Sequence, residues 1–358
     1  MSSKLFEPLQ VGTINLDHRV IMAPLTRFRA DSQHVPLSMA TTYYVQRASV
    51  PGTMIIAEAT IISPSAGGLP HAPGIWSEGQ IKGWKKITDA LIAVGRAADP
   101  AQLQADGGYV LHAPSPIPIE PGMPVPKELD EYEVQQIIGD FATAAKNAIR
   151  AGFDGVEIHG ANGYLVDQFL QDVSNKRNDQ WGGSIPNRAR FGLEVAKAVA
   201  DAIGAERVGF RVSPWNTWQS MKMVDPVPQF AYFVERLQQL KLAYLHVIES
   251  RVINNIDCEK EGSIKFLLDI WGNSAPVIVA GGYKPQNVET AMEEEYKDHQ
   301  IAIAFGRHFI ANHDLPFRIR QSIPLNPYHR ESFYTPMQED GYTNYPFNAE
   351  FIENRIQC

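Results

Sequence analysis

The feature that most constrains the fold is an alternation of short apolar runs with segments of helical periodicity, which is most regular from residue 151 onward. Seven runs have the length and composition of buried strands, at residues 19–25, 52–59, 151–160, 207–214, 242–250, 275–283 and 300–307. Helical segments between them include residues 131–151, 187–203 and 229–241. Strand and helix in repeated succession are typical of a parallel α/β fold.

This alternation favours a closed (β/α)8 TIM barrel, whose usual size is ~250 residues before insertions. The alternative is an open, doubly wound sheet. It has little support, because neither GxGxxG nor GxxxxGK[ST] follows any of the apolar runs. No linker, low-complexity tract or short-period repeat divides the chain. We therefore expect a single domain over residues 1–358.

The barrel needs one more strand, and the region from 60 to 150 offers no clear one. It holds a Pro-rich segment and two weak strand candidates, LIAVG at 91–95 and GYVLHA at 108–113. We predict that 91–95 takes the third-strand position, because it is the local apolar run placed between the strands ending at Glu58 and beginning at Ala151. The helix before it should then end near Thr88, and 108–113 is the second choice.

Bulk properties restrict the partners. The chain carries a formal net charge of −8 and no run of Lys or Arg, which argues against nucleic acid or an anionic membrane as the main partner. Its two cysteines, Cys258 and Cys358, cannot form a disulfide framework, and no apolar stretch has the length of a signal or transmembrane segment. We expect a cytoplasmic protein with a small-molecule ligand and assign no metal site. Monomer and homodimer both remain open.

Polar residues gather where the predicted strands end, which in a barrel is the face that carries the active site. The strand ends deliver Thr26, Arg27, Glu58, Ala59, His159, Asn162 and Tyr164. A histidine at a strand end is often a core residue, and Asn and Gly are common in turns. The number of strand ends with polar or glycine residues favours a functional site instead.

Three further strands add to this face. Arg211 alternates with apolar neighbours, so we expect it to point into the barrel, where a buried guanidinium needs an anion or a hydrogen-bonding ring. The last two strands end in AGGY at 280–283 and AFGR at 304–307. Glycines after the last two strands, with an arginine nearby, are typical of the phosphate site of many barrels.

Several segments occur in an order that is typical of one family. They include HRVIMAPLTRFRA, YYVQRASVPGTMIIAEAT, AGFDGVEIHGANGYLVDQFLQDVSNKRND, WGGSIPNRARF and AIAFGRHFIANHDLP. From about Leu5 to Phe347 the chain resembles the old yellow enzyme family of FMN-dependent ene-reductases. RAADP and the C-terminal FYTP and GYTNYPF are most similar to the branch that serves secondary metabolism, including ergot-alkaloid pathways.

The resemblance implies an enzyme that uses NADPH to reduce the C=C bond of α,β-unsaturated carbonyl or nitro compounds. His159 and Asn162 match the family residues that hold the carbonyl or nitro oxygen over the flavin, where hydrogen-bond donors stabilise its developing charge. Tyr164 matches the residue that protonates the α-carbon. A phenol, with an ordinary pKa of ~10, can supply that proton at neutral pH.

The resemblance also implies the contacts of FMN. Pro24, Leu25 and Thr26 would line the isoalloxazine, Ala59 would approach it by its backbone, and Arg211 would face N1 and O2. The phosphate would be held by a set that the last two strand ends provide, namely Gly281, Gly282, Gly306 and Arg307. Tyr334 would close the substrate pocket. The alternatives are a surface ion pair for Arg307 and an aromatic loop anchor for Tyr334.

The chain departs from the family at the third strand, which there carries a Gln that contacts the flavin pyrimidine. Here TDA at 88–90 runs directly into LIAVGRAADP, so that Gln has no counterpart and about one strand's length, on the order of ten residues, is absent. A true deletion, a loss in the gene model and a sequence that omits residues of the protein all remain open.

Three functions follow. The first is the FMN- and NADPH-dependent ene-reductase, the second a flavin-dependent isomerase or other enzyme without net redox change, and the third a degenerate barrel that does not hold FMN. Tyr164 favours the first over the second, because an isomerising enzyme benefits from a missing proton donor. The loops at 216–228 and 251–262 are polar or Met-rich and are expected to shape substrate specificity.

Overall fold

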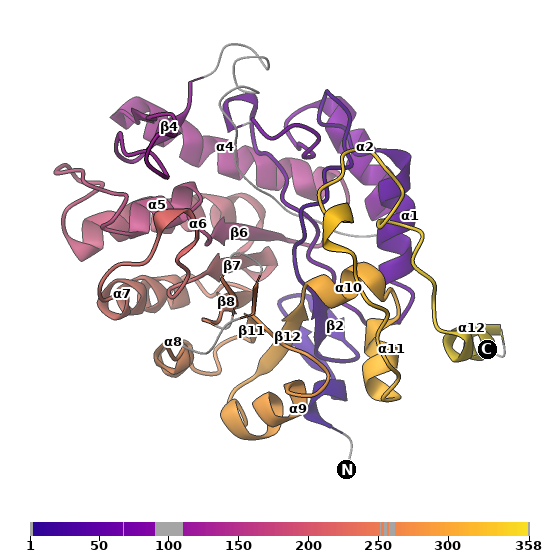
Figure 1. Cartoon of the computed structure of the whole chain (residues 1–358). Coiled ribbons are helices and arrows are strands. Elements are labelled where there is room, and N and C mark those ends of the chain that lie inside the picture. The colour runs from indigo at the N-terminus through magenta and orange to yellow at the C-terminus, as the bar shows by residue number, and fades with distance from the viewer. Residues whose placement is uncertain are drawn as a thin grey trace.

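The computed structural model describes residues 3–66, 68–89, 110–250, 252–253, 256–257 and 262–356. One parallel sheet runs through it in the order β3-β12-β11-β8-β7-β6. Its strands are β3 (Val20–Met22), β6 (Val156–Gly160), β7 (Val208–Val212), β8 (Tyr244–Ile248), β11 (Val277–Ala280) and β12 (Ile301–Phe305). Six of the seven predicted strand runs therefore form the sheet that Figure 1 shows.

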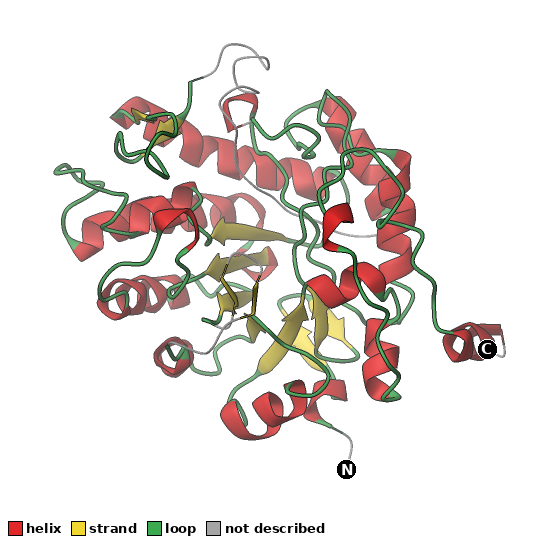
Figure 2. Ribbon diagram, in the orientation of Figure 1, coloured by secondary structure: helices red, strands yellow, loops and turns green. Residues whose placement is uncertain are grey.

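Helices surround this sheet (Figure 2). The predicted helical segments are α4 (Glu131–Arg150), α6 (Ile185–Ile203) and α7 (Val227–Gln238). A capping box between Asp130 and Glu133 begins α4, because each side chain accepts a hydrogen bond from the backbone N–H of the other residue. The other α-helices of the described residues are α1 (Ser38–Arg47), α2 (Glu78–Thr88), α5 (Leu165–Leu170), α8 (Lys265–Trp271), α9 (Val288–Thr290), α10 (Arg307–Ala311), α11 (Leu315–Arg320) and α12 (Ala349–Ile356). Within the part of the chain described, no helix has both the length and the apolar character needed to cross a membrane.

Alternate residues of the strands belong to different apolar clusters. Ile278 and Ala302 pack in an inner cluster, whereas their neighbours Val277 and Ile301 pack in a larger outer cluster with the helices. Both faces of the sheet are thus buried, which explains why the strands are apolar almost throughout. An inner core within an arc of parallel strands, and helices outside it, is the arrangement of a (β/α)8 barrel.

A short hairpin closes the inner cluster at the amino ends of the strands. It consists of β1 (Leu9–Val11) and β2 (Ile14–Leu16), which pair antiparallel. Its tip approaches the residues just before β7 and β8, since a Cβ on Gly12 would meet the carbonyl oxygen of Glu206 and Cβ of Ala243. A second antiparallel pair, β9 (Val252–Ile253) and β10 (Ile256–Asp257), follows β8.

The predicted second strand, 52–59, makes a single parallel bridge, between Ile55 and Met22. Met22 donates to the carbonyl of Met54 and accepts from the N–H of Ile56, at 3.0 and 2.9 Å. The segment therefore continues the sheet beyond β3, as predicted. Among the described residues no strand pairs with its other edge, which explains why it does not form a regular ladder.

The predicted third strand, 91–95, lies outside the described residues. The helix before it, α2, ends at Thr88 as predicted. The second choice, 108–113, does not enter the barrel sheet: its described end forms β4 (His112–Ala113), which pairs in parallel with β5 (Lys127–Glu128) in a separate two-stranded sheet. In the sheet as described, β6 is an end strand.

Candidate active site

A cavity of about 200 Å³ opens at the carboxyl ends of the strands. The residues that line it come from the ends of β3, β6, β7, β8, β11 and β12 and from the C-terminal segment. All of the predicted cofactor- and substrate-binding residues are among them: Pro24, Leu25, Thr26, Ala59, His159, Asn162, Arg211, Gly281, Gly282, Gly306, Arg307 and Tyr334. The structure thus brings together positions spread over more than 300 residues of sequence.

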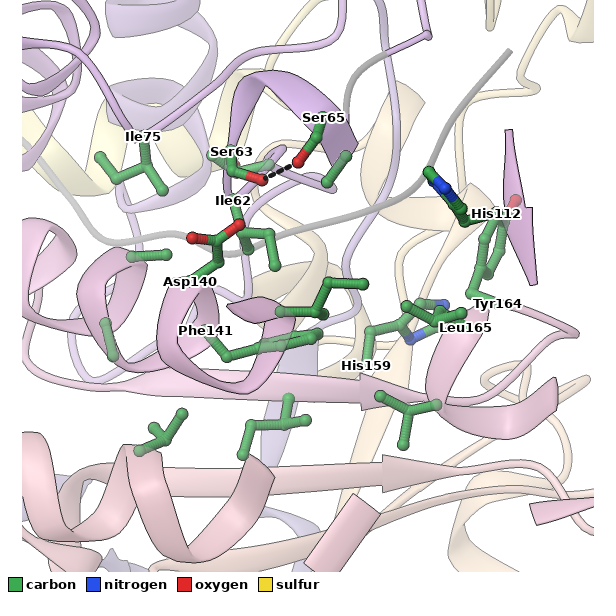
Figure 3. A pocket seen from close by; sticks show the side chains of 18 of the residues that line it. Ile62, Ser63, Ser65, Ile75, His112, Asp140, Phe141, His159, Tyr164 and Leu165 are labelled. Atoms are coloured by element: carbon green, nitrogen blue, oxygen red, sulfur yellow. Dashed lines mark hydrogen bonds between the residues drawn. The ribbon is translucent and has the colours of Figure 1, made fainter. Parts of the chain in front are cut away.

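Tyr164, the predicted proton donor, lies beside this cavity. Its ring centroid is 5.2 Å from that of His159, and it meets the ring of Trp218 edge to face at 6.3 Å. Tyr164 and His159 also line a second cavity of about 330 Å³, on the side of β6 toward α4. Figure 3 shows Tyr164 next to His159 in this second cavity, with Asp140 and Phe141 of α4 farther along it. His159 therefore borders both cavities.

The turn between His159 and Tyr164 is held by buried polar contacts. Asn162 adopts the left-handed conformation at φ 59°, and its backbone N–H donates to Ser213 Oγ at 2.8 Å. The N–H of Gly163 donates to Asp167 Oδ2, also at 2.8 Å. Asp167 is fully buried at the start of α5, and burial raises its pKa to about 7, although hydrogen bonds to its carboxylate from Gln171, Gly163 and Ser213 lower it in part.

A group of polar side chains lies within the barrel at the floor of the cavity. Arg211 of β7 is buried between His159 of β6 and His246 of β8, which are its register partners. Nδ1 of His246 lies 2.7 Å from Oε2 of Glu157, a further cavity residue. Burial would raise the pKa of Glu157, but His246 and Arg211 outweigh it and lower that pKa. Sequence reasoning missed Glu157 and His246.

The cavity has features that suit FMN. Arg211 Nε is buried and has no hydrogen-bond partner in the described residues, so the floor offers a donor that requires an acceptor. Beyond β11 the chain turns through Gly281 and Gly282 at φ 125° and 66°, a region that side chains strain. A Cβ on Gly281 would lie 3.2 Å from the carbonyl oxygen of Glu249. Arg307 donates to the hydroxyl of Tyr328 at 3.4 Å and also faces the cavity.

The C-terminal segment covers the cavity, and a contact that no sequence pattern indicated holds it there. Arg27 was expected at the cavity rim but is fully buried beside it, where its guanidinium donates to the carbonyls of Phe333 and Gly341, at 3.0 and 2.7 Å. Its backbone N–H donates to Glu58 Oε2 at 2.9 Å. These contacts fix the segment that carries Phe333 and Tyr334, both of which line the cavity.

The fold and the position of the cavity are those of a class of proteins, the α/β barrels that bind a small ligand over the carboxyl ends of their parallel strands. Residues 4–326 match the model of the NADH:flavin oxidoreductase / NADH oxidase family of FMN enzymes, and the chain belongs to this family. This confirms the family, the fold, the oxidoreductase class and the FMN that the sequence predicts.

Curated relatives cover nearly all of the chain. It is 50% identical to a chanoclavine-I aldehyde reductase of Penicillium roqueforti, over 98% of each sequence. It is also 50% identical to an NADP-dependent oxidoreductase of Aspergillus flavus, over 99% of this chain and 98% of the relative. A relative in Epichloe festucae var. lolii is named a probable inactive reductase and is 48% identical, over 100% of this chain and 99% of the relative.

Solved structures agree with this assignment. The old yellow enzyme of a Pichia species superimposes with a TM-score of 0.88 at 35% identity, over 97% of this chain and 94% of that one.

The alignment with the Epichloe relative spans 380 residues and all of this 358-residue chain, so that relative has positions for which this chain has no residue. That relative therefore has residues without a counterpart here, as the missing third-strand residues lead one to expect.

Proposed function

We propose that this chain is an FMN-dependent ene-reductase that uses NADPH to reduce activated alkenes, namely α,β-unsaturated carbonyl or nitro compounds. The observation that carries the proposal is the convergence of His159, Asn162 and Arg211 on one cavity, with Tyr164 beside it. The NADP-dependent oxidoreductase among the relatives supports the choice of nicotinamide, and the aldehyde reductase supports a carbonyl substrate.

FMN would lie between the β3 end, at Pro24 to Thr26, and the cavity floor. Arg211 would offer its unused Nε–H to the flavin, and Arg307 with the glycine turns would hold the phosphate. When reduced, the bound flavin supplies a hydride to the β-carbon of the alkene. Positive charge from Arg211 would stabilise the negative charge that reduction leaves on the flavin ring.

The chain's own side chains would then handle the substrate oxygen and the proton. His159 and Asn162 would donate hydrogen bonds to the carbonyl or nitro oxygen, where negative charge develops as the hydride arrives. The Tyr164 hydroxyl would give its proton to the α-carbon, and water would restore that proton. Tyr334 and Phe333 would cover the substrate, and the contacts of Arg27 fix both of them in place.

A second candidate is a flavin enzyme that isomerises its substrate and consumes no NADPH. The presence of Tyr164 beside His159 favours net reduction over this candidate, because an isomerising enzyme benefits from a missing proton donor. The degenerate barrel is the third candidate. The buried Nε of Arg211, which has no hydrogen-bond partner among the described residues, argues against it.

One experiment separates the three candidates. Purified protein is saturated with FMN, its visible spectrum is recorded, and anaerobic NADPH consumption with 2-cyclohexen-1-one is compared with product formed. We expect a yellow protein that forms one cyclohexanone per NADPH. A yellow protein that rearranges alkenes without consuming NADPH would support the isomerase, and one that stays colourless would support the degenerate barrel.

A further inference from the structure

The loop that follows β7 holds Asn162 on three sides. The Asn162 N–H donates to Ser213 Oγ at 2.8 Å, its carbonyl accepts from Gln219 Nε2 at 2.7 Å, and its side-chain Oδ1 accepts from Asn216 Nδ2 at 3.1 Å. Within the described residues, each polar atom of Asn162 except Nδ2 is therefore used. Asn162 lines the same cavity as His159, so Nδ2 is the donor left for a ligand there.

The direction of this hydrogen-bond chain is fixed by a backbone group. The backbone N–H of Trp218 donates to one amide atom of Asn216, at 3.1 Å. Because a backbone N–H can only donate, that atom must be the oxygen. The other amide atom of Asn216 is then the nitrogen, which can only donate, so the Asn162 atom that faces it must also be an oxygen. Because Asn162 Oδ1 faces Asn216, the Nδ2 of the Asn162 amide points to the side away from Asn216.

We propose that Asn216 is a positioning residue, which orients the Asn162 amide so that its N–H groups and not its carbonyl oxygen face the substrate. The proposal rests on the proposed function, in which Asn162 donates to the substrate oxygen. A reversed Asn162 amide would place Nδ2 against Nδ2 of Asn216 and would turn oxygen lone pairs toward the substrate oxygen. Asn216 is 8% exposed, so water cannot readily replace the lost hydrogen bond.

Replacement of Asn216 by aspartate or by alanine distinguishes this role from a structural one. Asn216→Asp keeps the shape of the side chain and the acceptor for the Trp218 N–H, but its carboxylate cannot donate to Asn162. The Asn162 amide should therefore reverse and present its oxygen to the cavity. Asn216→Ala removes the constraint and leaves both orientations accessible. A merely structural role predicts that aspartate is the milder change, and the positioning role predicts that it is the more severe one.

Two readouts are used on the holoenzyme. One is the affinity for p-hydroxybenzaldehyde, measured by calorimetry, and the other is kcat/KM for 2-cyclohexen-1-one. We expect both to fall roughly tenfold in Asn216→Ala and about a hundredfold in Asn216→Asp, as expected for loss and reversal of a donor. As the pH falls, the deficit of Asn216→Asp should narrow, because a protonated carboxyl can again donate to Asn162 Oδ1. FMN content and flavin reduction by NADPH should stay at the parent level.

A double-mutant cycle shows whether Asn216 acts through Asn162. In an Asn162→Ala background, Asn216→Asp should cause little further loss, whereas a direct effect of the new charge would persist. An aspartate variant milder than the alanine variant, or a full further loss in that background, would overturn the inference. If the unsubstituted protein binds p-hydroxybenzaldehyde but does not reduce 2-cyclohexen-1-one, the proposed function alone is overturned. If it does not bind p-hydroxybenzaldehyde, both the proposed function and this inference are overturned.

Discussion

The carboxylate of Glu157 is paired with the imidazole of His246, whose Nδ1 lies 2.7 Å from Oε2. The two residues stand on β6 and β8, which are not neighbours, because β7 runs between them. Gly209 of β7 is the register partner of both Glu157 and Tyr244, and the ring of Tyr244 lies where a side chain at 209 would be. A glycine thus lets the buried polar group form across an intervening strand.

Glu157→Gln should raise the midpoint potential of the bound flavin. In the parent, the lowered pKa of Glu157 keeps its carboxylate negative beneath the cavity, where this charge offsets the positive charge of Arg211. Removal of that charge should favour the reduced flavin by on the order of tens of millivolts. Arg211→Met is the matched variant of opposite sign and should lower the potential. Anaerobic titration against a reference dye measures both, and equal potentials in the two variants would contradict this assignment.

His159→Ala combined with Asn162→Ala should slow alkene reduction while NADPH still reduces the flavin at close to the parental rate. Loss of one oxyanion donor typically costs ~3 kcal/mol in the transition state, and the two losses need not add. Rapid-mixing experiments separate the two half-reactions. Reduction of 2-cyclohexen-1-one at the parental rate in this variant would remove the clamp role from both residues.

Gly209→Ala should destabilise the fold, because its Cβ would lie 2.1 Å from Cζ of Tyr244 in the barrel interior. Forcing a methyl group into a packed core typically costs about 1–3 kcal/mol. Gly139→Ala, on α4, is the matched control, since among the described residues nothing apart from its own stretch of helix lies within 4 Å of the Cβ position. The control should gain stability of about 0.5–1 kcal/mol. Urea unfolding measures the stability of both variants. Equal midpoints in the two would contradict the close contact between position 209 and the Tyr244 ring.

Asp167 should make the protein less stable as the pH rises from ~4 to about 7. Its folded-state pKa is raised to about 7 by burial, so the native carboxyl holds a proton that the unfolded chain has already released. The stability that this bound proton contributes is fully present below the pKa of the unfolded chain. It is lost as the pH rises through the pKa of Asp167 in the folded protein. Asp167→Asn should therefore flatten the fall in unfolding free energy between pH 5 and pH 7.

Glu58 should contribute to the slope that remains in that variant, because burial also raises its pKa to about 7, although Arg27 and Arg29 oppose the shift. Unfolding free energies from urea titrations at several pH values give both slopes. Identical slopes in Asp167→Asn and the parent would contradict the assignment of this titration to Asp167.

Strand periodicity predicted most of the barrel and the cavity. Arg211 could be placed inside because it alternates with apolar residues, and the same test applied to Glu157 and His246 would have found them. Glu157 stands two positions before His159, so both side chains face the same side of β6. These two residues were missed although the sequence carries their signal.

Other features depend on contacts that no local pattern encodes. The single bridge at Ile55 reflects the absence of a described partner on its outer edge, although its apolar sequence is typical of a full strand. Asn216 orients Asn162 through a loop conformation that composition does not predict. The loop was expected to affect specificity, but the sequence does not show which of its atoms reaches which partner.

The contact between Arg27 and the carbonyl of Gly341 joins positions 314 residues apart. Arg27 follows the first strand of the barrel, so a ribosome must synthesise more than 300 further residues before Arg27 can donate to the carbonyl of Gly341. Until then the C-terminal segment does not cover the cavity, and the guanidinium lacks all three of its carbonyl partners, those of Ser332, Phe333 and Gly341. A nascent chain that stops short of residue 332 should therefore leave this guanidinium with the Tyr43 hydroxyl in place of four acceptors, so the last segment to be synthesised completes the hydrogen bonding of one of the first.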